Sequence, residues 1–467
     1  MVLDKEVTCK CGIFVGHTIH DVYKGLKALQ HRGQDSVGIA VKKNGHIDLI
    51  RWSGRVGDFS LESLVNILGS GELVIGHVRY NTMKIKENAG LFSGAHPRFI
   101  GGKIIDNSVM YKSHLIVRDA EKVIVHNGNL PNLNLSEGKI DTDFILEEYS
   151  EKGIAFVLET FPASYSAAIL DSKINEAIIF RDRYKMRPLW IGEKDGNILA
   201  ASEDVAIWEV GGKPIREVNG GEVIHIPQRG RDFVSEQIIK PKQRICFFEG
   251  NYLQSASSSF DGRTVFSIRR NLGKQLAKEY FPNVDFVSFI PHSPEHIARG
   301  YSDERKIQLK EIFYKVASDR SFLGESQSKR DISIGTNLFV LDNISLVGKR
   351  ILIFDDSLVR GTVSKDAAKK LRERGAGWIG LVLGTPIIGP IVNGVQRGCL
   401  WGVDMPPEDN FAIKRMHTLE KLKEESGFDD VYFISIEGLA KAHGKNLNEM
   451  CTYCIGGENP VEEENIL

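Results

Sequence analysis

The sequence predicts a protein of two domains, an α+β domain followed by an α/β domain with a mainly parallel sheet. The chain of 467 residues is longer than one hydrophobic core usually serves. Short apolar runs separated by glycine and asparagine turns fill the chain up to about residue 239, which is typical of packed sheets. Beyond Lys242, helical and strand-like segments alternate, which is the pattern of a parallel sheet covered by helices.

In the first half, short apolar segments are expected to form strands. They cover residues 73–75, 123–125, 167–170 and 177–180. Val22, Leu26 and Leu29 recur instead at a helical interval, so a helix is expected there. Sheets with helices packed on them therefore make up this half.

In the second half, the expected strands are continuous apolar runs at 286–290, 351–354 and 378–383. The expected helices carry an apolar stripe or end at a glycine, and they cover residues 265–276 and 364–374, with Gly375 as the stop. Strand, helix and strand in succession form a βαβ unit, and such a sheet binds its ligand at the carboxyl ends of its strands.

Composition excludes several classes of protein. Lysine and arginine together number 60 against 61 acidic residues, so no overall basic field attracts nucleic acid. No apolar run approaches the roughly 20 residues that span a bilayer, and residues 1–10 lack the apolar centre of a secretory signal. We therefore expect a cytoplasmic protein that binds neither nucleic acid nor membranes. Its 6 cysteines are too sparse for a disulfide scaffold and indicate catalysis or metal binding.

Cys11 begins a strand-like run and follows a short polar segment, residues 1–10, which is interpreted as a propeptide. Cleavage before Cys11 would give its thiol an α-amino group as a neighbouring base. That amine can take the thiol proton and later return it to leaving ammonia. A buried structural cysteine is the alternative interpretation of this residue alone. Cys9 is assigned no role, because it would leave with the propeptide.

Three further segments follow Cys11-Gly12-Ile13 in a recognisable order. They read Gln30-His31-Arg32-Gly33-Gln34, then Gly76-His77-Val78-Arg79-Tyr80, then Asn127-Gly128-Asn129. This order resembles the glutaminase domain of the N-terminal-nucleophile amidotransferases over the first half of the chain. The resemblance implies an α+β N-terminal-nucleophile hydrolase fold, an αββα sandwich, in which the cysteine releases ammonia from glutamine.

The same resemblance implies roles for residues of these segments and for Asp141. Arg79 would bind the α-carboxylate of glutamine and Asp141 its α-ammonium, and Arg32 is expected in the same site. Asn127 and the backbone amide of Gly128 would form the oxyanion hole, which needs fixed hydrogen-bond donors. Taken one by one, the charged residues are commoner as surface ion-pair partners, and Asn-Gly is commoner as a hairpin turn.

The segment Asp355-Asp356-Ser357-Leu358-Val359-Arg360-Gly361-Thr362 lies between an expected strand and an expected helix. Backbone amides there can bind a phosphate, and the carboxylates can take ribose hydroxyls or Mg²⁺. Its sequence is similar to the phosphoribosyltransferase motif DDSIVRGTT of the glutamine phosphoribosylpyrophosphate amidotransferases. The resemblance implies Mg²⁺ on Ser293, Asp355 and Asp356, and a phosphoribosyl group bound by Asp355, Asp356, Ser357, Arg360, Gly361 and Thr362.

Other segments also resemble the sequences of that family: Arg187-Pro188-Leu189, Ala201-Ser202-Glu203, and Cys246-Phe247-Phe248-Glu249. The resemblance implies a glutaminase domain at 11–240 and a phosphoribosyltransferase-like domain at 241–467. Ammonia from glutamine would displace pyrophosphate from phosphoribosylpyrophosphate to give 5-phosphoribosylamine, the first step of de novo purine biosynthesis. It also implies a homodimer or homotetramer, with purine nucleotides as candidate regulators.

Four cysteines remain: Cys246, Cys399, Cys451 and Cys454. The last two form a single C-x-x-C, which is compatible with zinc, with an iron–sulfur cluster or with no metal. Some members of the family carry a [4Fe–4S] cluster on cysteines in these four sequence contexts. The resemblance therefore favours a structural cluster over zinc.

Departures from the family pattern concentrate in the second half. A segment resembling NRYxGRTF is only partly retained at 311–322, and Asn337 stands where a lysine is expected, a loss for which Arg320 or Arg330 could compensate. Two alternatives stay open: an amidotransferase with a changed phosphosugar acceptor, and a non-catalytic nucleotide- or redox-responsive homologue. The complete glutaminase set argues against the second. The Asp355-Asp356 unit argues against a sugar isomerase domain.

Overall fold

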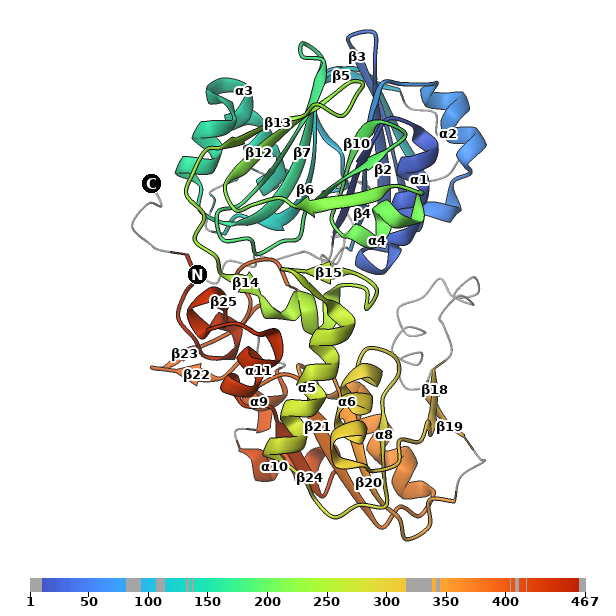
Figure 1. Ribbon diagram of the computed structural model, residues 1–467, viewed down its shortest axis with the longest axis vertical. Coiled ribbons are helices and arrows are strands. Elements are labelled where there is room, and N and C mark those ends of the chain that lie inside the picture. The colour runs from blue at the N-terminus through green and yellow to red at the C-terminus, as the bar shows by residue number, and fades with distance from the viewer. Residues whose placement is uncertain are drawn as a thin grey trace.

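The computed structural model describes residues 11–80, 94–105, 114–131, 133, 135–136, 138–315, 338–341, 345–403, 405–407, 411–416 and 418–461. The part up to β13 forms one body, and the part from β14 onward forms a second body below it (Figure 1). The chain crosses between them in the segment that follows β13.

The first body contains a 13-stranded antiparallel sheet. Its strands follow one another in the order β11-β9-β10-β1-β4-β2-β3-β6-β7-β8-β12-β13, and the remaining strand, β5, pairs with β6. Its strands are β1 (Gly12–Gly16), β2 (Ser36–Lys43), β3 (His46–Ser53), β4 (Leu73–Arg79), β5 (Arg98–Ile105), β6 (His114–Asn129), β7 (Ser164–Asp171), β8 (Glu176–Arg181), β9 (Trp190–Lys194), β10 (Asn197–Ala201), β11 (Lys213–Glu217), β12 (Glu222–Pro227) and β13 (Val234–Gln237). Its helices are α1 (Ile19–Ala28), η1 (Gln30–Arg32), η2 (Val56–Asp58), α2 (Leu61–Leu68), α3 (Asp141–Thr160) and α4 (Asp204–Glu209).

Alternation of side chains along the strands produces four layers. Ile13 and Val15 of β1 share a core with side chains of β6, β7 and β8, whereas Phe14 packs with α1, α2 and α4 on the other face. Ile124 of β6 points away from that shared core and packs with α3. Successive side chains of a strand face opposite sides, so a strand buried on both faces is apolar throughout. The predicted αββα sandwich is confirmed.

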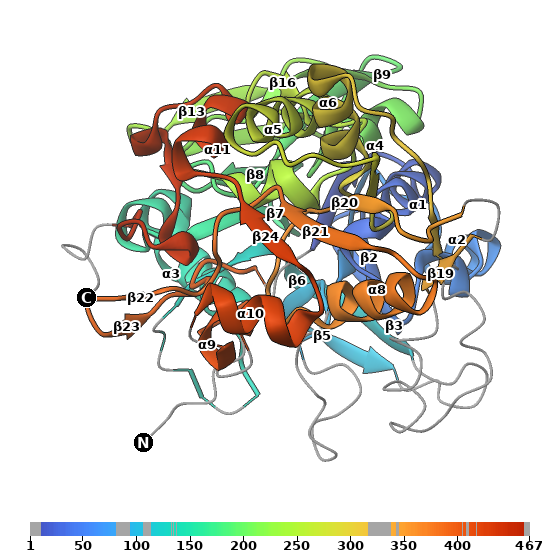
Figure 2. The same cartoon turned by 90° about the horizontal axis from the view of Figure 1, so that it is seen from below.

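The second body is built on a 4-stranded sheet in the order β17-β20-β21-β24, in which each neighbouring pair is parallel. Its strands are β17 (Phe286–Phe289), β20 (Arg350–Asp355), β21 (Trp378–Leu383) and β24 (Asp430–Phe433), and its helices are α5 (Val265–Glu279), α6 (Glu295–Arg305), α8 (Thr362–Glu373), α9 (Ala412–Met416), α10 (Leu419–Ser426) and α11 (Ile436–His443). Seen from below, α5, α6 and α11 cover one face and α8 and α10 the other (Figure 2). The predicted parallel sheet is confirmed.

Short elements surround this sheet: β14 (Ile245–Cys246), η3 (Glu249–Leu253), β15 (Ser259–Phe260), β16 (Arg263–Thr264), β18 (Phe313–Lys315), β19 (Leu338–Val340), β22 (Ile391–Val392), β23 (Val395–Gln396), η5 (Leu447–Glu449), β25 (Met450–Cys451) and η6 (Tyr453–Ile455). The helix predicted from Ser364 begins at Thr362 instead, because Gly361 adopts the left-handed conformation (φ 77°) and turns the chain into the helix there. The predicted stop, Gly375, is also left-handed (φ 81°).

Candidate functional site

Cys11 lies directly before β1 and is only 3% exposed. β1 runs antiparallel to β4 with Gly12 opposite Val78, so Cys11 and Arg79 lie side by side at the ends of these strands. His77 Nε2 lies 3.0 Å from the carbonyl oxygen of His126, which ties β4 to the end of β6. Cys11 and Arg79 are therefore close to the strand that carries Asn127 and Gly128.

Asn127 is completely buried, and neither its Nδ2 nor its Oδ1 has a hydrogen-bond partner among the residues that the structure describes. A buried amide without partners costs about 1–3 kcal/mol, and a bound ligand that supplies the missing partners would recover this cost. A Cβ added to Gly128 would lie 2.2 Å from the carbonyl oxygen of Ser164, so no side chain fits at this position. This geometry suits the oxyanion hole predicted for the pair.

Asp141 begins α3, where its Oδ2 accepts a hydrogen bond from the backbone N–H of Leu130 at 3.1 Å. Its Oδ1 lies 3.9 Å from His126 Nδ1. Thr142 Oγ1 sits between two imidazoles, 3.0 Å from His126 Nδ1 and 2.9 Å from His96 Nε2. Burial lowers the pKa of His126, an effect that Asp141 and Cys11 oppose, so the ring lies within electrostatic reach of both. Sequence reasoning missed His96, His126 and Thr142.

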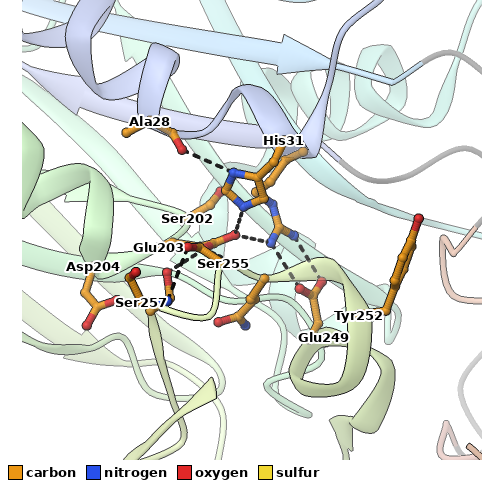
Figure 3. Close-up of polar contacts among 12 residues, drawn as sticks. Ala28, His31, Ser202, Glu203, Asp204, Glu249, Tyr252, Ser255 and Ser257 are labelled. Atoms are coloured by element: carbon orange, nitrogen blue, oxygen red, sulfur yellow. Dashed lines mark hydrogen bonds and ion pairs between the residues drawn. The ribbon is translucent and has the colours of Figure 1, made fainter. Parts of the chain in front are cut away.

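Arg32 is one member of a buried ion network that joins the two bodies. Figure 3 shows its two carboxylates, Glu203 of the first body and Glu249 of the second. Arg32 Nη1 donates to Glu203 Oε1 at 2.7 Å, and its Nη2 donates to Glu249 Oε1 at 3.1 Å. Arg187 Nη1 donates to the same Glu249 oxygen at 2.8 Å. These four residues are at most 1% exposed. The two positive and two negative charges therefore balance one another inside the protein.

The third guanidinium nitrogen of Arg32 contacts the backbone of Cys11: Nε donates to the Cys11 carbonyl oxygen at 2.8 Å. Burial works against the charge of Arg32, but Glu249 and Glu203 outweigh it and raise its pKa further. These bonds favour a role for Arg32 in fixing the main chain of Cys11 over the predicted contact with glutamine. The sequence did hold a sign of this network. Glu203, Glu249 and Arg187 lie in segments that match the family's sequence, but the match alone assigned them no role.

Glu203 makes the network sensitive to pH. Burial disfavours its charged form, but His31 and Arg32 outweigh burial and hold its pKa below the usual value for glutamate. A depressed pKa contributes stability that is complete above the unfolded value of about 4.3 and is lost as the pH falls. We expect the difference in urea midpoint between wild type and Glu203→Gln to stay level from about pH 7 to about pH 5 and to shrink as the pH falls from about 5 toward about 3. A constant difference would contradict this, and exposed Glu236→Gln is the matched control.

The Asp-Asp loop follows β20 at the carboxyl edge of the parallel sheet. Asp355 Oδ1 accepts from the backbone N–H of Asp356 at 2.9 Å, and Asp355 Oδ2 accepts from Ser364 Oγ at 3.2 Å. Burial and the neighbouring Asp356 carboxylate raise the pKa of Asp355. Ser357 Oγ donates to Asp356 Oδ1 at 2.9 Å. Gly361 and Thr362 form the N-terminus of α8 directly after Arg360.

Ser293 follows β17, the strand beside β20, so it lies at the same edge as the Asp-Asp loop. It lines a cavity of about 490 Å³ that also includes His31 of the first body, together with Tyr252, Gln254, Ser255 and Arg269. Asp356 and Asp355 add to burial in raising the pKa of Tyr252, so this cavity adjoins the acidic pair. The cavity therefore lies between the ion network and the predicted phosphosugar site.

The four remaining cysteines come together. β14 pairs in parallel with β25, which places Cys246 opposite Cys451, and all four thiols line one cavity of about 10 Å³. Cys399 Sγ accepts backbone N–H bonds from Trp401 at 3.4 Å and Val403 at 3.3 Å. Burial and then the neighbouring thiols raise the pKa of Cys451 and Cys454, and burial raises that of Cys246 to about 12.

Four buried thiolates in one place would repel one another, so their chemistry suits a cation or a cluster that neutralises them. The cavity is about the size of one water, and no group of three or more His, Cys, Asp or Glu side chains within the described ranges has the geometry of a metal site. The set of donors thus fits a metal or a cluster.

Several predicted features lie outside the described residues. They are the propeptide with Cys9, and the pyrophosphate-side positions Arg320, Arg330 and Asn337. Within the described part of the chain, no helix is both long and apolar enough to cross a membrane.

The fold and the two sites define a glutamine amidotransferase coupled to a phosphoribosyltransferase-type domain. Residues 103–222 match the glutamine amidotransferase domain family. The amidophosphoribosyltransferase of Methanocaldococcus jannaschii is 30% identical, over 97% of this chain and 98% of that protein. The Bacillus subtilis amidophosphoribosyltransferase is 29% identical, over 98% of this chain and 95% of that protein.

Solved structures agree with the sequence relatives. The Bacillus subtilis glutamine phosphoribosylpyrophosphate amidotransferase, solved with ADP and GMP, superposes with a TM-score of 0.81 at 27% identity, covering 97% of this chain and 98% of that one. A structure described as the allosteric regulatory enzyme of purine biosynthesis gives a TM-score of 0.82 at 28% identity, with 97% and 96% covered. This chain belongs to the amidophosphoribosyltransferase family. The predicted family, fold class and enzyme class are confirmed.

Proposed function

We propose that this chain releases ammonia from glutamine at Cys11 and uses it to displace pyrophosphate from phosphoribosylpyrophosphate, giving 5-phosphoribosylamine. The observation that supports this most is the buried Asn127 amide without described partners beside Cys11 and Arg79, in a chain whose second body presents Asp355 and Asp356 at the edge of its sheet. A cytoplasmic location, a homodimer or homotetramer, and regulation by purine nucleotides belong to the same proposal.

In the glutaminase half, the α-amine of Cys11, once residues 1–10 are removed, takes the thiol proton. The thiolate attacks the carboxamide carbon of glutamine, and the resulting oxyanion accepts hydrogen bonds from Asn127 Nδ2 and the backbone N–H of Gly128. The amine returns its proton to the departing ammonia, and water then hydrolyses the thioester to glutamate. Arg79 and Asp141 hold the two charged ends of the substrate.

In the second half, the backbone around Gly361 and Thr362 binds the sugar 5′-phosphate at the N-terminus of α8. Ser293, Asp355 and Asp356 would hold Mg²⁺, which neutralises the charge of departing pyrophosphate. Ammonia forms its bond to C1 of the ribose as the bond from C1 to pyrophosphate breaks. A changed phosphosugar acceptor is the second candidate, because the segment Ser255-Ala256-Ser257-Ser258 offers this cavity no charged side chain, and Ser258 Oγ donates to Glu203 Oε2.

We further propose that Cys246, Cys399, Cys451 and Cys454 hold a structural [4Fe–4S] cluster. Anaerobically purified protein is expected to contain iron and acid-labile sulfide in equal amounts, and Cys246→Ser to lose both. The same variant should unfold at lower temperature, because the cluster would cross-link β14, β25 and the chain near Cys399. Cys9→Ser is the matched control and should retain the cluster. Zinc in place of iron would overturn the assignment.

The reaction is tested by measuring glutamate release from glutamine with and without phosphoribosylpyrophosphate and Mg²⁺, while pyrophosphate is followed in parallel. Pyrophosphate and glutamate appearing in equal amounts is the expected result. Glutamate without pyrophosphate would replace the proposed acceptor by another phosphosugar. Absence of both products from protein with a free amine at Cys11 would overturn the proposed function.

A further inference from the structure

The cavity that the four cysteines line is closed by side chains from both bodies. β14 and β25, which carry Cys246 and Cys451, lie at the top of the second body, beneath the first (Figure 1). Ser164 and Arg187 of the first body line the cavity together with the thiols and with Trp401 of the second body. Ser164 is completely buried and Trp401 is 4% exposed. The cysteine cavity therefore lies at the boundary between the two bodies, away from solvent.

Alternation along β7 determines where the Ser164 side chain lies. Tyr165 packs in the core that α3 covers, whereas Ala168 and Leu170 face the core between the two layers of strands. Successive side chains of a strand face opposite sides, so Ser164 is on the same face as Ala168 and Leu170. Ser164 is the first residue of β7, and at this end of the strand that face meets the cysteine cavity.

Two hydrogen-bond donors at this cavity have no acceptor. Ser164 Oγ and Trp401 Nε1 are both buried, and neither has a hydrogen-bond partner among the residues that the structure describes. An indole N–H can only donate, and a hydroxyl has one proton to donate. Burial removes both groups from water without replacing the lost bonds, so an acceptor in the cavity would stabilise them.

The Trp401 donor is held in place by its own backbone. Its backbone N–H donates to Cys399 Sγ at 3.4 Å, and the backbone N–H of Val403 donates to the same sulfur at 3.3 Å. The carbonyl oxygen of Trp401 accepts a hydrogen bond from Arg187 Nη2 at 2.6 Å. The segment is thus fixed to a cysteine on one side and to the first body on the other, which keeps the indole at the cavity.

The charge of a cluster explains what such donors do. An iron–sulfur cluster with four thiolate ligands is an anion, and each electron that it accepts adds negative charge. That charge is costly in an enclosed cavity, where water cannot solvate it. Hydrogen bonds to the sulfurs offset the cost, and they do so most in the more negative state. Donors at the cavity therefore raise the reduction potential and make it harder for an oxidant to remove an electron.

We propose that Ser164 Oγ and Trp401 Nε1 donate hydrogen bonds to the sulfurs of a cluster held by the four cysteines, and that these two bonds raise its reduction potential. Ser164 belongs to the first body and Trp401 to the second, so the potential depends on the packing of the two bodies against each other. This inference rests on the cluster proposed above.

The test uses anaerobically purified full-length variants. Ser164→Ala and Trp401→Phe each remove one donor and keep the backbone bonds. Ser166→Ala and Trp190→Phe are the matched controls, because Ser166 Oγ and Trp190 Nε1 are also buried without partners in the described part of the chain, but lie outside the lining of this cavity. Iron and acid-labile sulfide are measured first, to show that each variant carries the cluster.

Two measurements then report on the loaded cluster. Voltammetry gives the potential of its one-electron couple, with the electrode supplying the electron. Ferricyanide in turn takes one electron from the cluster and becomes ferrocyanide, and the rate at which the cluster absorbance bleaches measures how readily the oxidised cluster breaks down.

Ser164→Ala and Trp401→Phe are each expected to lower the equilibrium constant for reduction about tenfold, which is about 59 mV for a one-electron couple. Both should also bleach faster than wild type, whereas the two controls should stay within about twofold of it. A purely structural role would lower the iron content but leave the potential of the loaded protein unchanged. An unchanged potential in either loaded variant would therefore overturn the inference alone. Wild-type protein that contains zinc, or neither iron nor sulfide, would overturn the proposed cluster itself.

Discussion

Cys11→Ala is expected to lower glutamate release by at least about a thousandfold, because the reaction then has no nucleophile to form the thioester. Pyrophosphate release with an ammonium salt should persist, since the Asp355–Asp356 site lies in the other body and needs only ammonia. The two rates are measured on the same preparation, with circular dichroism to confirm folding. Loss of both rates would show that the variant is misfolded rather than chemically disabled.

Two matched variants sharpen this result. Cys11→Ser retains a hydroxyl and should be more active than Cys11→Ala but far below wild type, because an alcohol is a much weaker nucleophile at neutral pH than a thiolate. Cys9→Ala should behave as wild type. N-terminal sequencing of active protein should begin at Cys11. A fully active Cys11→Ala protein would contradict the proposed mechanism, whether or not residues 1–10 had been removed.

Glu249→Ala is expected to lower the free energy of unfolding by about 3–5 kcal/mol, the usual loss when one partner of a buried ion pair is removed. Arg187 would then lose its bond to Glu249, and Arg32 would keep Glu203 as its carboxylate partner. Both guanidinium groups are 1% exposed, so water cannot take the place of the lost acceptor. The measurement is the urea midpoint, followed in both bodies by fluorescence and circular dichroism.

The controls separate charge from volume. Glu249→Gln keeps the shape and one acceptor oxygen and should lose less stability than Glu249→Ala. Exposed Glu236→Ala on β13 should change stability by no more than about 0.5 kcal/mol. Equal midpoints for Glu249→Ala and Glu236→Ala would contradict a structural role for the network.

Local sequence patterns predicted several of the elements and most of the candidate residues. Short apolar runs predicted β4, β6, β7, β8, β20 and β21, and the interval from Val22 to Leu29 predicted α1. The Asp-Asp loop was placed correctly at the end of β20, because a buried strand followed by acids, glycine and a helix is readable within one short segment. Helix starts were less accurate, as at Thr362, because the left-handed Gly361 rather than any periodicity begins that helix.

The sequence by itself determined the class of each half and indicated Cys11 as the candidate nucleophile and Asp355–Asp356 as the candidate phosphosugar loop, since each depends on residues that are neighbours in the chain. Only the tertiary structure decided that Arg32 reaches Glu203 and Glu249 rather than facing solvent, and that Cys246 meets Cys451 across a parallel strand pair. Periodicity reports which face of an element is buried, but not which distant element covers that face. That choice follows from packing the two bodies together, where each buried charge must find its partner from another part of the chain.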